Sequence, residues 1–308
     1  MVWLPLRRSA RRSDPVIGTS QGWAELAPAK VNLCLHVGPV QADGYHPLAS
    51  LVAFADVGDR VTVAPAQALS LTVTGPFGEG LAGQGDNLIL KALRALGQAT
   101  GTGDPRLHVT LDKRLPIAAG LGGGSSDAGA ALRLARHALD LDISDEALEA
   151  VAGVVGADGP MCLRARTAWA EGIGDRLTET PDLPPLHAVL VNPGVPCSTG
   201  AVYRAYDALP VGNADRPADP QDLSPAGVIR WLTNQRNDLQ APALTVALEI
   251  AQALGALSAC EGAGLVRMSG SGATVFALFE TAGEAQAAAE RIASGYPRWW
   301  VVPTILGG

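Results

Sequence analysis

The chain has 308 residues, 47% of them hydrophobic and 17% charged, which is the length of two typical domains with ample material for a packed core. Its formal net charge of −7 argues against a nucleic-acid partner, because phosphate backbones are held by clustered Lys and Arg. No apolar run reaches the ~20 residues that a membrane span needs, so no membrane partner is expected.

The cysteines lie far apart and form no CxxC pair, which argues against a disulfide set or a zinc site. We expect free, buried thiols and a reducing cytoplasm. The four cysteines are Cys34, Cys162, Cys197 and Cys260.

The first 22 residues are basic and lack the apolar stretch that follows the basic region of a signal peptide. An organelle-targeting segment is one interpretation of them. A disordered basic tail over residues 1–22, or a start codon assigned too far upstream, fits the composition better. A proline-rich stretch near residue 181 separates two predicted domains, residues 23–180 and residues 181–308.

Strand and helix patterns begin after the tail. Residues 26–38, "LAPAKVNLCLHVG", alternate strictly and predict a half-buried strand, with Val31, Leu33, Leu35 and Val37 on one face. The same period places Lys30 on the other face with Asn32. "DGYHPL" at 43–48 indicates a turn. The next segments predict two strands and a helix, at 59–65, 69–75 and 86–100.

A glycine run follows the next predicted strand, "RLHVTLDKRLPI" at 106–117, and precedes an alanine-rich helix. Ser125, Ser126 and Asp127 are good residues for the start of that helix. A glycine loop between a strand and a helix N-terminus binds anions, because free N–H groups and the helix dipole face it. The loop is neither a Walker A sequence nor a dinucleotide fingerprint. A phosphate cradle is favoured, and a purely structural turn is the alternative.

The rest of the chain continues this mixed pattern. A helix is predicted from the N-cap Ser144 to Gly156, and Asp158 follows it in "GADGP". Beyond residue 181 we expect strands at 186–194, 264–280 (two, around a turn of small residues) and 298–304, helices at 198–208, 237–257 and 281–294, and a polar loop at 211–225.

Six motifs in this order carry a family resemblance: "PAKVNLCLHV", "DGYHPL", "LPIAAGLGGGSSDA", "GADGPMCL", "EGIGDRL" and "MSGSGATVFALF". Together they resemble the kinases named for galactokinase, homoserine kinase, mevalonate kinase and phosphomevalonate kinase, over residues 23 to 306. The resemblance implies a two-domain α+β fold. Its N-terminal domain would bind ATP, its C-terminal domain would be ferredoxin-like, and the substrate would lie between them.

"PAKVNL" with "DGYH", and "GLGGGSSDA" with a later "GAD", narrow the resemblance to members that act on a cytidylyl substrate. The implied reaction moves the γ-phosphoryl group of ATP to the C2 hydroxyl of 4-diphosphocytidyl-2-C-methyl-D-erythritol, in non-mevalonate isoprenoid biosynthesis. A sister kinase for homoserine or mevalonate, and a nucleotide-binding module without catalysis, are the alternatives. The protein would be a monomer or a homodimer.

The resemblance also implies roles for individual residues. Asp158 would accept the alcohol proton, and Lys30 would keep it ionised and steady the reacting oxygens. From the residues alone, turn chemistry is the favoured explanation of Asp158, and a solvated strand face is the usual one for Lys30. The implied substrate contacts are Asn32, Tyr45, His46, Thr199 and Tyr203. The implied ATP loop is Pro116, Ile117, Ala118, Ala119, Gly120, Leu121, Gly122, Gly123, Gly124, Ser125 and Ser126.

The metal would arrive with the nucleotide. ATP needs Mg²⁺, Ser126 can approach the ion, and no acidic cluster in the sequence predicts a metal site built by the protein. The sequence departs from the family pattern at Gly159 and Met161, which bears on the packing behind Asp158.

Overall fold

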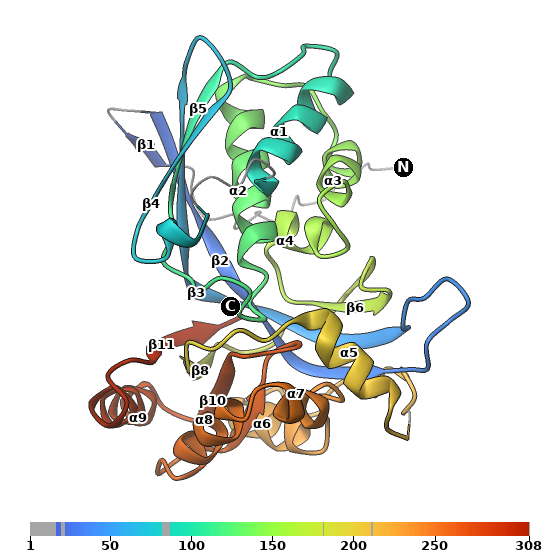
Figure 1. Cartoon of the computed structure of the whole chain (residues 1–308), viewed down its shortest axis with the longest axis vertical. Coiled ribbons are helices and arrows are strands. Elements are labelled where there is room, and N and C mark those ends of the chain that lie inside the picture. Colours follow the sequence, from blue (N-terminus) through green and yellow to red (C-terminus); the bar gives the residue numbers. More distant parts are fainter. Residues whose placement is uncertain (1–16, 20–21, 82–86, 181, 211, 308) are drawn as a thin grey trace, which may run out of the picture.

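The computed structural model describes residues 17–19, 22–81, 87–180, 182–210 and 212–307 (Figure 1). The predicted basic tail therefore lies outside the described residues, except Gly22 and the short strand β1 (Ile17–Thr19), which pairs antiparallel with the start of β2. None of the helices in the described part of the chain is both long and apolar enough to cross a membrane.

The N-terminal half is a sheet covered on one side by helices α1 to α4 (Figure 1). Its long strands β2 and β3 pair antiparallel, β3 also pairs with β5 and β6, and β4 runs parallel to β5. The elements are β2 (Gly22–Val37), β3 (Leu48–Pro65), β4 (Ser70–Thr74), η1 (Gly78–Leu81), α1 (Leu88–Ala99), β5 (Leu107–Asp112), α2 (Gly123–Ala138), α3 (Asp145–Gly153), α4 (Gly159–Arg164), β6 (Ala168–Gly172) and β7 (Arg176–Glu179).

The C-terminal half has four antiparallel strands in the order β11-β8-β10-β9. Counted along the chain, these are the fourth, first, third and second strands, which is the order of a ferredoxin-like sheet. One residue pair, Leu306 with Ala55, joins β11 to β3. The elements are β8 (Leu186–Asn192), α5 (Thr199–Asp207), α6 (Pro225–Thr233), α7 (Gln240–Val246), α8 (Glu249–Ser258), β9 (Leu265–Met268), β10 (Val275–Phe279), α9 (Ala282–Gly295) and β11 (Trp300–Leu306).

The strand predicted at 26–38 is present, and Lys30 and Asn32 both line the cavity, but the predicted apolar face is wrong beyond Leu33. The pairing with β3 shifts register between Asn32 and Cys34, as in a β-bulge. Val31 and Leu33 therefore pack in one apolar cluster and Leu35 in another. The strand is also buried on both faces rather than half-buried, because β2 lies at the centre of the molecule.

Helix ends follow the predicted capping chemistry at some positions and depart from it at others. The Ser144 hydroxyl accepts a hydrogen bond from the N–H of Ala147, as predicted for an N-cap. Helix α3 ends at Gly153 rather than Gly156, and the stretch predicted as one helix at 237–257 is two helices, α7 and α8. Helices α4 and α6 and the β6–β7 hairpin were not predicted.

Candidate functional site

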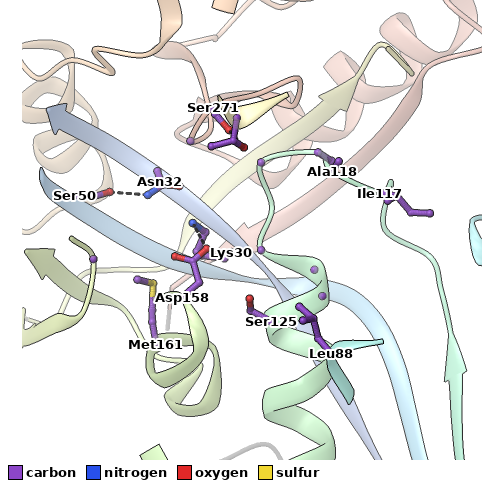
Figure 2. A pocket seen from close by; sticks show the side chains of 18 of the residues that line it. Lys30, Asn32, Ser50, Leu88, Ile117, Ala118, Ser125, Asp158, Met161 and Ser271 are labelled. Atoms are coloured by element: carbon purple, nitrogen blue, oxygen red, sulfur yellow. Dashed lines mark hydrogen bonds and ion pairs between the residues drawn. The ribbon is translucent and has the colours of Figure 1, made fainter. Parts of the chain in front are cut away.

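A cavity of about 510 Å³ opens between the two halves of the molecule, beside β2. It is lined by the glycine-rich segment before α2, the start of α4, helix α5 and the turn between β9 and β10. Figure 2 shows Lys30 and Asp158 together in its middle, with Asn32 and Ser50 on one side and Ser125 and Leu88 on the other.

Lys30 and Asp158 form an ion pair, with Lys30 Nζ donating to Asp158 Oδ2 at 3.2 Å. The backbone N–H of Lys30 donates to the carbonyl of Leu121, so β2 and the glycine loop are joined at this residue. The Lys30 side chain is 9% exposed and that of Asp158 40% exposed. The Lys30 ammonium is therefore largely buried, whereas the Asp158 carboxylate is partly exposed in the cavity.

The packing behind Asp158 explains the unusual Gly159 and Met161. A Cβ on Gly159 would lie 2.0 Å from the carbonyl oxygen of Ala152, so only glycine lets α4 begin this close to α3. Met161 is buried, lines the cavity and packs in a cluster with Val52 of β3. The departure from the family pattern therefore leaves Asp158, the N-cap residue of α4, on a supported helix end.

Two glycines in the loop are needed by its backbone. Gly122 is the N-cap of α2 with φ +61°, and no side chain caps the first N–H groups of that helix. Gly120 has φ +74°, and a Cβ there would lie 2.5 Å from the carbonyl oxygen of Ser269. The Ser269 hydroxyl donates in turn to the carbonyl of Gly120. The loop is thus packed onto the "SGSGA" turn, and the N-terminus of α2 is available to an anion.

Most of the predicted ATP loop faces the cavity. Leu121 and Ser126 do not line it, because both side chains are buried; Ser125 does, so the hydroxyl that faces the cavity is that of Ser125 rather than Ser126. Ala118 has φ +51°, a conformation that glycine adopts at lower cost. The predicted loop residues that line the cavity are Pro116, Ile117, Ala118, Ala119, Gly120, Gly122, Gly123, Gly124 and Ser125.

A cluster of buried charged side chains lies beneath the loop and was not predicted from the sequence. Lys113 Nζ donates to Asp59 Oδ2 at 2.5 Å and to Asp127 Oδ2 at 2.7 Å. Asp59 also accepts two backbone N–H groups, whereas Asp127 Oδ1 is buried with no hydrogen-bond partner among the described residues. The "DK" of "LDKRLP", directly before the loop, was the available signal.

Burial raises the pKa of Asp127 well above its ordinary value; Lys113 opposes this and Asp59 adds to it. Burial lowers the pKa of Lys113, but the two carboxylates outweigh it and the net shift is upward. Asp127 is therefore the carboxyl group of the cluster whose protonated, neutral form is favoured by burial.

The predicted substrate contacts separate into two groups. Asn32, Thr199 and Tyr203 line the cavity, whereas Tyr45 and His46 do not. Tyr45 is 59% exposed on the turn before β3, and His46 is buried. The structure thus brings three of the five together, and the binding roles of all five stay predictions.

Polar side chains on the cavity wall opposite the loop form hydrogen bonds with one another. Asn32 Nδ2 donates to the Ser50 hydroxyl at 2.7 Å, while Asn32 Oδ1 is buried without a partner among the described residues. The hydroxyls of Thr199 and Ser271 lie 2.8 Å apart. Burial, and then the charge of Asp158, raise the pKa of Tyr203 to about 12, so its hydroxyl stays protonated.

All four cysteines are free and buried, as predicted. Burial raises the pKa of Cys162 to about 12, so this thiol is not a nucleophile at neutral pH.

Known proteins share this architecture. The family model for the GHMP kinases N terminal domain matches residues 87–165, and that for the GHMP kinases C terminal matches residues 224–298. A crystal structure of homoserine kinase from Cytophaga hutchinsonii has a TM-score of 0.63 at 17% identity, over 97% of this chain and 96% of that one. That likeness shows the fold alone, and the predicted two-domain α+β class is confirmed.

Two matches of higher sequence identity show which GHMP kinase family the chain belongs to. The 4-diphosphocytidyl-2-C-methyl-D-erythritol kinase of Caulobacter vibrioides is 52% identical over 278 residues, 89% of this chain and 96% of its own. A crystal structure of 4-(cytidine 5'-diphospho)-2C-methyl-D-erythritol kinase has a TM-score of 0.74 at 35% identity, over 92% of this chain and 99% of that one. The chain therefore belongs to the 4-diphosphocytidyl-2-C-methyl-D-erythritol kinase family of the GHMP kinases.

Proposed function

We propose that this chain transfers the γ-phosphoryl group of ATP to the C2 hydroxyl of 4-diphosphocytidyl-2-C-methyl-D-erythritol, giving the 2-phosphate and ADP in the non-mevalonate route to isoprenoid precursors. The observation that carries the proposal is the Lys30–Asp158 pair in a cavity with an uncapped helix N-terminus on one side and Asn32, Thr199 and Tyr203 on the other. Family membership supports the choice of acceptor.

On the nucleotide side, the first N–H groups of α2 and the positive end of its dipole attract the phosphates. Gly123 and Gly124 leave the backbone open to close approach, and the Ser125 hydroxyl faces the same space. In phosphoryl transfer the protein mainly positions the reactants and stabilises the charge on the transferring group. A packed loop can hold the phosphates in position for this.

On the acceptor side, Asp158 accepts the proton of the C2 hydroxyl. The alcohol oxygen forms the new bond to phosphorus as the bond to the leaving ADP oxygen breaks, so the proton rests on the Asp158 carboxylate. Lys30 donates to that carboxylate at 3.2 Å and offers positive charge to the transferring group. Asn32 lines the cavity on the acceptor side.

The site suits Mg²⁺ that enters with the nucleotide. The described residues contain no group of three or more His, Cys, Asp or Glu placed to hold a metal. Asp158, Asp127 and the Ser125 hydroxyl are among the oxygen groups that line the cavity. When bound, the ion neutralises charge on the β- and γ-phosphate oxygens.

The experiment that tests the proposal is a phosphoryl-transfer assay with three acceptors. ADP release should be measured with 4-diphosphocytidyl-2-C-methyl-D-erythritol, homoserine and mevalonate, and the phosphorylated carbon assigned by ³¹P NMR. We expect turnover with the first acceptor only, at C2. Preference for homoserine or mevalonate would make the chain a sister kinase, and ATP binding without turnover would make it a binding module.

Gly124→Val should raise the KM for ATP at least about tenfold, or about 1.4 kcal/mol of binding, with the acceptor KM unchanged. The added side chain would stand in the space that the phosphates approach, and the atom it meets is a movable end of Leu88, 3.2 Å from the Cβ. Gly123 is a poorer choice because its Cβ would lie 3.0 Å from Lys113 Nζ.

Gly255→Val is the matched control, since Gly255 is exposed on α8 with nothing within 4 Å of its Cβ. Steady-state kinetics and melting curves of both variants decide the matter. If folded Gly124→Val has unchanged ATP kinetics, the phosphates do not bind at this end of the loop.

We also propose that residues 23–180 and 181–308 are the two domains, since the family's two domain models match on either side of residue 181. A cytoplasmic location fits four free, buried thiols and an ATP-dependent reaction.

A further inference from the structure

His46 is a buried residue whose ring does not reach the cavity. It belongs to the segment that joins β2 to β3, and its ring lies against helix α5. Its Nδ1 lies 2.9 Å from the carbonyl oxygen of Gly38, and its Nε2 lies 3.2 Å from Asp207 Oδ1. Both ring nitrogens are therefore engaged by the protein itself.

The His46 ring supports Tyr203, which does line the cavity. The two ring centroids are 5.0 Å apart with planes tilted by 33°, and the Tyr206 ring lies edge-on to His46 at 5.6 Å. Tyr206 donates its hydroxyl to the carbonyl of Val37 at 2.5 Å and accepts the N–H of Gly212. The segment 38–47 and α5 are thus joined at several points, with Tyr203 between them and the cavity.

Helix α5 carries three of these groups at a spacing of four. Thr199, Tyr203 and Asp207 lie one helical turn apart and so share a face. Thr199 is tied to Ser271 of the β9–β10 turn, and Asp207 is tied to His46. Tyr203 stands between two anchored ends, which limits how far its ring can turn.

We propose that Asp207 is a positioning residue for the acceptor: by fixing the His46 ring it sets the orientation of Tyr203, against which the base of the substrate packs. The inference rests on the proposed function, because it assigns the Tyr203 wall to the cytidylyl part. A flat aromatic ring held in place binds a base with little loss of side-chain freedom.

The test compares Asp207→Ala, Asp207→Glu and His46→Ala by the KM for acceptor, the KM for ATP and kcat. Asp207→Ala should raise the acceptor KM about tenfold, near the low end of what a base–aromatic stack contributes, with the KM for ATP unchanged. Asp207→Glu, which can still reach Nε2, should restore most of the loss. An unaltered acceptor KM in folded Asp207→Ala would overturn the proposal.

A double-mutant cycle separates positioning from general structural support. Because Asp207 acts through His46, the variant with Asp207→Ala and His46→Ala together should have the acceptor KM of His46→Ala alone. Additive losses would overturn the proposal. If Asp207→Ala does not fold, Asp207→Leu takes its place in the cycle, since its side chain is close in size and cannot accept a hydrogen bond.

Two further variants distinguish a failure of the Asp207 proposal from a failure of the proposed function. Asp145→Ala removes a carboxylate of similar exposure, 48% against 43%, that pairs with Arg136 outside the cavity, and should leave the acceptor KM unchanged. Tyr203→Ala should raise that KM at least as much as Asp207→Ala. A loss in Tyr203→Ala without one in Asp207→Ala refutes the role of Asp207 and leaves the proposed function standing. Wild-type protein that does not turn over the acceptor refutes the proposed function itself.

Discussion

Asp158→Asn should lower kcat by roughly 10²–10⁴ while the acceptor KM changes little. The amide is nearly the same size as the carboxylate but cannot take the alcohol proton. Asp158 is the N-cap of α4 without a side-chain capping bond, so its replacement removes no helix cap. Single-turnover and steady-state kinetics with the cytidylyl acceptor provide the measurement.

Lys30→Met tests the other half of the pair and should also lower kcat, because the transferring charge loses its cation. If the two groups act as a unit, the double variant should be little worse than Asp158→Asn. Asp145→Asn, outside the cavity, is the control for a carboxylate-to-amide change. Near-normal turnover in both single variants would mean that the pair is structural and that the catalytic base lies elsewhere.

Lys113→Met should destabilise the fold by about 3–5 kcal/mol, because it leaves the carboxylates of Asp59 and Asp127 buried without their common cation. Adding Asp59→Asn and Asp127→Asn to Lys113→Met should recover part of that loss, since no buried charge then remains. Urea unfolding of the single and triple variants measures both effects. A single variant as stable as the parent would show that the cluster is hydrated in solution.

The pH dependence of stability tests whether Asp127 is the carboxyl group whose pKa is raised by folding. A raised pKa in the folded state means that folding favours the protonated carboxyl. Its contribution to stability is complete below the ordinary aspartate pKa of about 3.9 and is lost as the pH rises through the raised folded value. Asp127→Asn should therefore gain stability relative to the parent from about pH 4 upward. Parallel stability curves would mean that the pKa of Asp127 is not raised in the folded protein.

Local chemistry was enough to predict much of the fold from the sequence. The alternation in β5, the Ser144 cap and the glycine segment before α2 each depend on residues a few positions apart, so they act whatever the rest of the chain does. Six short motifs in a fixed order were enough to predict the family, and two of them contain Lys30 and Asp158, the proposed catalytic pair. Gly122 in the left-handed region agrees with the predicted loop, because only glycine takes that conformation at little cost.

What the sequence left undecided are contacts between segments far apart along the chain. Asp158 and Lys30 are separated by 128 positions and Lys113 and Asp59 by 54, and no local pattern specifies which side chains meet across such distances. The bulge after Asn32 moved Leu35 away from Val31 and Leu33, because one inserted residue reverses the side of everything beyond it. His46 lies with its ring nitrogens near oxygens of Gly38 and Asp207, contacts that its motif did not indicate, and its substrate contact stays a prediction. Alternation and capping act within a few residues, whereas the cavity is formed where packing brings separate segments from both halves of the chain together, and only the tertiary structure could decide that.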